Sequence, residues 1–456
     1  MNQPHDGLPG EPGRVPEAPK ALQRRRFLGG AAAGAAGLLA GGVGGYSIGS
    51  SRAQQPAAGS GDAAAGSRVA PTAGADLVNT AGPDAGVVSF YGEHQAGITT
   101  RQQEQMMFAS FDVTTVDPLA LQQLLGRWAA VASRFAAGNT ASGAAPATDR
   151  PPDDTGEGVD LGAHSLTITV GFGASLFDDR FGLAAKMPAA LRPVGALPGE
   201  GDMDAALSGG DLCVQACADD PQVVFHAIRN FTRIARGTAV LRWSQLGFGR
   251  ASATGTGQTT PRNLFGFKDG TRNIHADETA VIDTDVWVGQ DDPQSWMRGG
   301  SYLVARKIGM IIESWDATVL GEQERIFGRT KASGAPLTGG TEFTAPDFAA
   351  KAADGAPVID VGAHVRLAAP ESNGGVRILR RGYNYTDGLD ATGRLDAGLF
   401  FVSFQSDPAH FVALQTKLGQ HDLLNEYIVH RGGGTWACPP GVAAAGDWFG
   451  KQLFQG

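Results

Sequence analysis

Asn263-Leu-Phe-Gly-Phe-Lys-Asp-Gly-Thr-Arg-Asn273 is the most informative segment of this 456-residue chain. Two glycines, Gly266 and Gly270, enclose one carboxylate, Asp269. Taken alone, the Asp-Gly pair indicates a turn, because both residue types suit the backbone conformations that turns require. A turn of this kind is more often structural than catalytic, so a catalytic role for Asp269 needs support from motifs elsewhere in the chain.

Two more segments stand out further along the chain. Gly362-Ala-His-Val-Arg-Leu-Ala-Ala-Pro370 places a single histidine, His364, in an apolar run, and Ile378-Leu-Arg-Arg-Gly-Tyr-Asn-Tyr385 contains a pair of arginines. Alone, such a histidine is more often a core residue of an apolar strand, and such arginines more often form a solvated face. These structural interpretations of the turn, the histidine and the arginines hold only if the three segments are unrelated.

Together, the three segments resemble the dye-decolourising haem peroxidases. Gly266-Phe-Lys-Asp-Gly270 matches the GxxDG signature of that family, in register with His364 and Arg380. The resemblance covers roughly residues 87–455 and is strongest to the exported branch that includes deferrochelatase/peroxidase proteins. Three further segments contribute to it: Phe90-Tyr-Gly-Glu-His-Gln-Ala-Gly-Ile98, Gly398-Leu-Phe-Phe-Val402 and Gly432-Gly-Gly434.

The resemblance implies that haem b (iron protoporphyrin IX) is the cofactor and that His364 is its iron ligand. Haem iron commonly takes a neutral imidazole on its proximal side. A carboxylate should hold the other ring nitrogen and raise the basicity of the ligand. Asp396 and Asp407 are the candidates for this carboxylate, and the sequence leaves the choice between them open.

On the distal side, the resemblance assigns catalysis to Asp269 and Arg380. Hydrogen peroxide must lose a proton from one oxygen and gain it on the other before its O–O bond breaks, and a positioned acid–base group does this. Arg380, the first arginine of its pair, would stabilise the negative charge on the leaving oxygen. Unperturbed Asp titrates at about 3.9 and His at about 6.5, so a distal Asp predicts a pH optimum of roughly 4–5.

Other residues are expected to surround the haem. The turn Gly270-Thr271-Arg272 should border it with polar atoms near a propionate, and Leu399 and Phe401 are expected on its distal face. The remaining histidines have no comparable motif support, and we expect structural roles for them: His5, His94, His164, His226, His275, His410, His421 and His430.

The alternation of elements favours an α+β fold. Apolar and β-branched runs predict strands, and apolar residues at helical spacing predict helices between them. Two similar halves suggest two ferredoxin-like units, residues 87–240 and the haem-binding 241–456, joined as a dimeric α+β barrel-type core with antiparallel sheets. Strands are expected at 106–113, 166–172, 212–218, 301–312, 376–380 and 398–405, helices at 118–136, 221–234, 316–329 and 410–418, and a surface loop at 137–159.

The first 86 residues have the pattern of an export signal and a linker. Gln23-Arg-Arg-Arg-Phe-Leu28 precedes an uncharged Gly/Ala/Leu run from Gly29 to Gly44, which resembles a twin-arginine signal peptide over residues 1–53. A retained membrane anchor is the alternative, but the glycines make this run a poor helix. Residues 54–86 predict a flexible linker. We therefore expect export by the twin-arginine translocase to a secreted, periplasmic or cell-surface location, a route typical of proteins that acquire a cofactor before export.

Charge and cysteine content exclude some classes of protein. The formal net charge is −9, and it is −12 without residues 1–53, so the chain should bind no nucleic acid, which requires excess Lys and Arg. Three cysteines, Cys213, Cys217 and Cys438, argue against a disulfide framework and predict small buried residues.

Two functions from different classes remain open. The first is peroxide-dependent oxidation of bulky organic donors such as dyes. Donors too large for the pocket would react at surface aromatic residues, with Trp243, Trp296 and Trp436 as candidates. The second is haem handling, in which a deferrochelatase releases iron from haem during iron uptake. A chlorite dismutase-like activity would share the fold, but the GxxDG signature argues against it. A homo-oligomer is possible in either case.

Overall fold

The structure is a computed structural model that describes residues 86–143, 147–193, 195–201, 203–255 and 257–455. The expected signal peptide and nearly all of the expected linker lie outside these residues. Among the described residues, no helix is long and apolar enough to cross a membrane.

The first half of the described chain is a βαββαβ unit. It consists of β1 (Gln105–Val113), α1 (Pro118–Ala136), β2 (Thr167–Gly173), β3 (Leu212–Ala218), α2 (Pro221–Ile234) and β4 (Ala239–Arg250). Both helices begin at an Asp-Pro pair: the side chains of Asp117 and Asp220 accept backbone N–H groups of the first turn, and proline follows at the first helical position. The strands pair antiparallel in the order β2-β3-β1-β4, which is the ferredoxin-like arrangement.

The second half repeats this plan with additional helices. Its strands are β5 (Ser301–Met310), β6 (Leu379–Arg380), β7 (Tyr383–Leu389), β8 (Leu395–Gln405) and β9 (Ile428–Cys438). Its helices are α3 (Thr279–Asp285), α4 (Ile312–Asp316), α5 (Leu320–Phe327), α6 (His364–Leu367) and α7 (Ala409–His421). The strand order β9-β5-β8-β7 matches the order in the first half, and the short β6 pairs with β8 next to β7.

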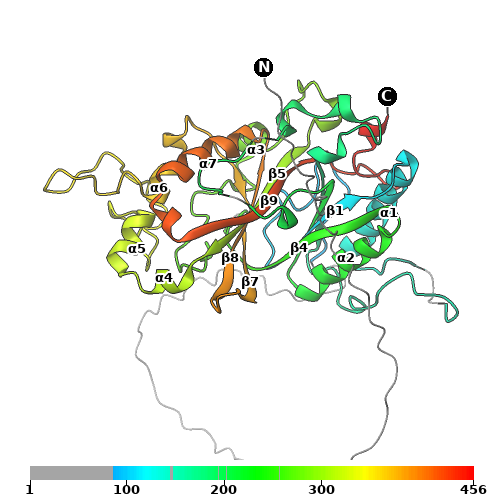
Figure 1. The fold of residues 1–456 in the computed structure, drawn as a ribbon, viewed down its shortest axis with the longest axis horizontal. Helices are drawn as coiled ribbons and strands as arrows, with labels where there is room; N and C mark the ends of the chain where they lie inside the picture. Colours follow the sequence, from blue (N-terminus) through cyan, green and yellow to red (C-terminus); the bar gives the residue numbers. More distant parts are fainter. Residues whose placement is uncertain (1–85, 144–146, 194, 202, 256, 456) are drawn as a thin grey trace, which may run out of the picture. The chain divides into compact units, whose positions relative to one another are not determined.

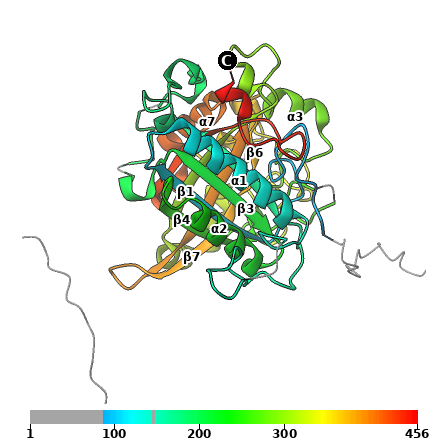
Figure 2. The ribbon, with the colours of Figure 1, turned by 90° about the vertical axis from the view of Figure 1, so that its right-hand side faces the viewer.

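The two units close into one barrel. Antiparallel pairs β2–β9 and β4–β7 join them, so eight strands form a complete ring. Figure 1 shows α1 and α2 on one side of these strands and α4, α5, α6 and α7 on the other, and Figure 2 shows α1 and α2 in front of the strands of the first unit. The predicted α+β class with two ferredoxin-like units and antiparallel sheets is confirmed.

Three apolar clusters fill the spaces that this arrangement creates. One lies between the first sheet and α1 and α2, and contains Trp128 and Phe231. A second fills the barrel interior with aromatic side chains, among them Trp243 and Trp436. The third, around Trp315, packs beneath the helices of the second unit. Cys213, Cys217 and Cys438 are buried and unpaired, as predicted.

Several boundaries differ from the sequence prediction. The strand expected to reach residue 312 ends at Met310, and the helix expected over 316–329 is divided into α4 and α5. Thr318 and the β-branched Val319 lie at the break, where the Thr318 hydroxyl bonds to the Ser314 carbonyl. Of 376–380, only Leu379–Arg380 is a strand. The division expected at 240/241 falls inside β4, which pairs with β1 along its length.

Candidate active site

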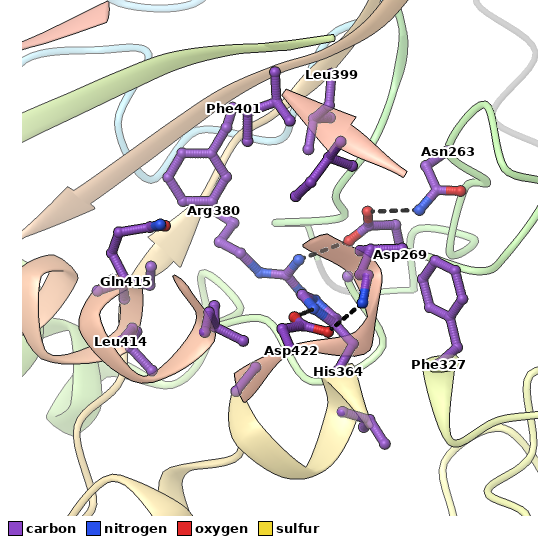
Figure 3. A pocket seen from close by; sticks show the side chains of 18 of the residues that line it. Asn263, Asp269, Phe327, His364, Arg380, Leu399, Phe401, Leu414, Gln415 and Asp422 are labelled. Carbon is purple, nitrogen blue, oxygen red and sulfur yellow. Dashed lines mark hydrogen bonds and ion pairs between the residues drawn. The ribbon is translucent and has the colours of Figure 1, made fainter. Parts of the chain in front are cut away.

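The main cavity lies between the outer face of the second sheet and helices α6 and α7. Side chains alternate across β8, so that Leu399 and Phe401 line the cavity while Phe400 packs inside the barrel. Leu414 and Gln415 of α7 line it from the helical side. Figure 3 shows these side chains around Asp269, Arg380 and His364. Leu399 and Phe401, expected beside the cofactor, line this cavity, and their place on its distal face stays a prediction.

The Asp269 turn depends on two glycines in left-handed backbone conformations. Gly266 has φ +82°, and Gly270 has φ +99°. A Cβ atom on Gly270 would also lie 3.0 Å from the Cα atom of Ser252 and 3.1 Å from the nitrogen of Ala253. The turn therefore requires glycine both for its conformation and for its close approach to the neighbouring chain.

Asn263 holds the carboxylate of Asp269 from the side of the turn. Its Nδ2 donates to Oδ2 of Asp269 at 3.2 Å, while its Oδ1 accepts from the backbone nitrogens of Phe265 and Phe267 at 3.1 and 3.3 Å. A single side chain thus fixes both the turn and the orientation of the carboxylate. No role for Asn263 was predicted from the sequence.

Arg380 reaches Asp269 from β6. Its Nη1 donates to Oδ1 of Asp269 at 2.6 Å, and the two side chains are 29% and 15% exposed. Asn273 positions the strand: its Oδ1 accepts from the Arg380 nitrogen, and its Nδ2 donates to the Arg380 carbonyl, both at 2.8 Å. The first and last residues of the quoted segment, Asn263 and Asn273, therefore hold the two members of this pair.

Arg381 faces away from the cavity, because successive residues of a strand point to opposite sides. It is fully buried, and its guanidinium donates to the carbonyl of Thr100, to the Thr254 hydroxyl and to Oε1 of Gln103. This placement is consistent with the choice of Arg380 over Arg381.

His364 begins α6 and points into the same cavity. Its Nδ1 donates to Oδ2 of Asp422 at 2.6 Å, and the Asp422 side chain is only 3% exposed. Burial lowers the pKa of His364, but the Asp422 charge and hydrogen bond outweigh burial, so the pKa is raised above 6.5. This leaves Nε2 as the nitrogen available to a metal.

The carboxylate partner of His364 was not among our candidates. Asp407 instead caps the start of α7 through the nitrogen of Ala409, and Asp396 lies 3.5 Å from the Tyr385 hydroxyl. Asp422 directly follows α7, and its Oδ1 accepts from the Leu424 nitrogen at 2.9 Å. His364 starts a helical turn, so the alternative of a core histidine in an apolar strand does not apply to it.

The turn residues predicted to border the cofactor also line the cavity: Gly270, Thr271 and Arg272. Arg272 forms an ion pair with Glu371 at 2.7 Å, and the Thr271 hydroxyl donates to Glu342 at 3.2 Å. Their contact with a propionate stays a prediction.

Two family models match this chain along most of the described residues. The first, Dyp-type peroxidase, N-terminal, covers residues 95–249, and the second, Dyp-type peroxidase, C-terminal, covers residues 260–443. The chain therefore belongs to the Dyp-type peroxidase family, and it is an oxidoreductase that acts on peroxide.

Relatives with known names or structures agree with this assignment. A deferrochelatase of Escherichia coli strain K12 is 41% identical over 376 residues, which are 80% of this chain and 87% of the relative. The DyP-type peroxidase structure from Streptomyces coelicolor is 40% identical with a TM-score of 0.74, covering 82% of this chain and 98% of that one. The corresponding structure from Cellulomonas bogoriensis is 36% identical with a TM-score of 0.73, covering 82% and 100%.

The cavity fits the haem that this family carries. Its lining is mostly apolar, with Leu399 and Phe401 on the sheet and Leu414 on α7. His364 offers a nitrogen donor backed by a buried carboxylate, which is the usual arrangement for a metal-ligating imidazole. His364 would hold the iron, while Asp269 and Arg380 would stand beside the reacting peroxide.

The tryptophans that we expected at the surface are buried. Trp243, Trp296 and Trp436 are 6%, 3% and 0% exposed. Trp243 and Trp436 lie in the barrel interior, and Trp296 packs against Phe172 and Phe177. None of the three offers a surface at which a bulky donor could bind.

Proposed function

We propose that this protein uses hydrogen peroxide to oxidise bulky organic donors such as dyes. The observation that carries the proposal is the ion pair between Asp269 and Arg380 in the cavity that also contains His364. A carboxylate and a guanidinium at this site supply the two functions that peroxide cleavage requires: proton transfer and stabilisation of developing negative charge.

Each residue has a defined task in this mechanism. Haem held by His364 would supply iron and the electrons that reduce peroxide. Asp269 would take the proton from one peroxide oxygen and deliver it to the other, which would leave as water. Arg380 stabilises the charge on that oxygen. Asp422 holds the imidazole of His364 in the tautomer that leaves Nε2 free.

A second function is favoured by one comparison. The relative from Escherichia coli is named deferrochelatase, so release of iron from haem is the alternative activity of this site. This activity needs His364 to bind haem, but it does not need peroxide cleavage by Asp269 and Arg380.

The two functions differ in their products. The purified holoprotein should be mixed with peroxide and an anthraquinone dye, and separately with haem and a ferrous-iron chelator. Loss of dye colour that requires peroxide supports the proposal. Accumulation of iron-free porphyrin without dye oxidation would instead establish haem handling and refute it.

We also propose that the protein is exported folded by the twin-arginine route. The proposal rests on Arg24, Arg25 and the uncharged run after them, which lie outside the described residues. Export after folding would let haem bind before the chain crosses the membrane.

A further inference from the structure

Arg306 lies in the wall of the cavity and has no role in the mechanism above. It is on β5 and only 7% exposed, and it contributes to the cavity lining. Its Nε donates to Oε1 of Glu200 at 2.6 Å, and its Nη1 donates to the carbonyls of Ala305 and Gly434 at 2.9 and 3.3 Å. Its guanidinium is therefore fixed in one orientation.

One nitrogen of this guanidinium is left available. Within the described part of the chain, Nη2 of Arg306 makes no hydrogen bond, although Nε and Nη1 are both engaged. Burying an ion pair such as Arg306–Glu200 costs free energy that the attraction between the charges only partly repays. A buried arginine with free donors in a cavity wall is therefore better explained by a ligand than by stability.

The segment around Glu200 holds this arrangement in place. It belongs to the connection between β2 and β3, in the first unit, and reaches the second unit at two points. The Pro198 carbonyl accepts from Nε2 of Gln415 at 2.9 Å, and the Gly199 carbonyl accepts from Nδ1 of His430 at 3.1 Å. Gln415 and His430 both line the cavity beside Arg306. His430, for which we expected a structural role, is therefore also part of this wall.

Arg306 lies on the sheet side of the cavity, next to α7. Its guanidinium carbon lies 4.9 Å from the ring centroid of Phe411 on α7, and the rings of Phe411 and Phe401 are 5.8 Å apart. The sheet and the helix thus meet at this end of the cavity. Figure 3 shows Phe401 and Gln415 at the end opposite Asn263 and Phe327.

We propose that Arg306 is a carboxylate-binding residue for an apolar ligand in this cavity. The planar guanidinium matches the geometry of a carboxylate, and the mostly apolar lining favours an apolar body that bears this group. Two ligands have this chemistry: haem itself, through a propionate, and a free aromatic carboxylate that serves as a donor.

The first arm of the test compares haem b with its dimethyl ester, which lacks both charges. Each is bound to the apoprotein, and its dissociation is followed by transfer to an excess of a haem-scavenging protein. In the wild type, the ester should dissociate at least about tenfold faster than haem b, the range for one charged hydrogen bond. In the double variant Glu200→Gln/Arg306→Gln, haem b should dissociate faster than from the wild type. The ratio of the two dissociation rates, ester over haem b, should fall by about tenfold.

The paired substitution avoids leaving Glu200 buried without a partner. Glu200→Gln alone is the matched control, because it keeps Arg306 and should keep the advantage of haem b. Arg306→Lys keeps the positive charge opposite Glu200 but removes the planar guanidinium. It should therefore also reduce the difference in dissociation rate between haem b and its ester. This variant replaces the double variant if the double variant does not fold. Because the ester removes the charges of both propionates, Arg272→Gln is measured as well, to separate the contribution of a propionate near Arg272 from that of one near Arg306.

The second arm titrates the holoproteins with benzoate and follows the Soret band. Benzoate binding that requires Arg306, with no change in the ester comparison, would assign the site to a free carboxylate. A smaller difference in dissociation rate between haem b and its dimethyl ester in the Arg306 variants would assign the site to a haem propionate. If neither measurement depends on Arg306, the inference is wrong.

Discussion

The hydrogen bond between His364 and Asp422 should control how firmly the protein holds haem. Asp422→Asn is nearly isosteric and keeps Oδ1, which accepts from the Leu424 nitrogen, but it removes the charge beside Nδ1. The bond is 2.6 Å long and joins side chains that are 3% exposed at Asp422 and 32% exposed at His364, so solvent screens it only in part. A hydrogen bond to a charged group of this kind contributes about 1.5–3 kcal/mol.

Loss of this bond should weaken haem binding by about 10–100-fold, the usual effect of removing such a partner of a metal ligand. The pKa of His364 in the apoprotein should fall, because burial would then act without the Asp422 charge. Haem dissociation rates and the reduction potential should be measured, and the potential should rise as the imidazole becomes a weaker donor.

Asp396→Asn and Asp407→Asn are matched controls, because neither carboxylate contacts His364. They should leave both quantities unchanged. This account of the ligand would be refuted if Asp422→Asn kept the wild-type haem dissociation rate and reduction potential while Asp396→Asn or Asp407→Asn changed them.

Three other outcomes are expected. His364→Ala should lose haem or bind it loosely, and an unchanged Soret spectrum with full haem content would disprove the ligand assignment. Asp154 is half-buried, and its Oδ1 lies 2.9 Å from Nε2 of His226. Partial burial raises the pKa of Asp154, but hydrogen bonds from backbone nitrogens and from His226 outweigh this and lower the pKa below its ordinary value of 3.8. The contribution of ionised Asp154 to the free energy of unfolding is therefore complete above pH 3.8, and it is lost as the pH falls through the lower pKa of the folded protein. Asp154→Asn should lower the free energy of unfolding by about 1–2 kcal/mol at neutral pH and reduce its dependence on pH in the acid range. Replacing Arg24 and Arg25 with Lys should leave precursor in the cytoplasm, and export at the wild-type level in a fractionation experiment would contradict the twin-arginine route.

Local sequence predicted the residues whose positions depend on local structure. Gly266 and Gly270 marked the turn of Asp269 because a left-handed conformation leaves a signature in the sequence. Apolar and β-branched runs likewise predicted most strands, and apolar residues at helical spacing predicted α1 and α2 with the bounds that the structure shows.

Contacts between distant segments could not be predicted in this way. Asp422 lies 58 residues after His364, and only the packing of α7 against α6 brings the two together. The tryptophans were placed at the surface because their burial depends on closure of the barrel, which no local pattern of Trp243 or Trp436 reveals. The Glu200–Arg306 pair joins the two units across 106 residues and was missed for the same reason.

The peroxide step in Asp269→Asn and Arg380→Leu tests the central claim most directly. Stopped-flow mixing of each holoprotein with peroxide, at several pH values, measures this step apart from donor oxidation. We expect both variants to bind haem normally and to react about 10²–10³-fold more slowly. Rates near the wild type in both variants would contradict peroxide cleavage by this pair and leave haem handling as the function of the site.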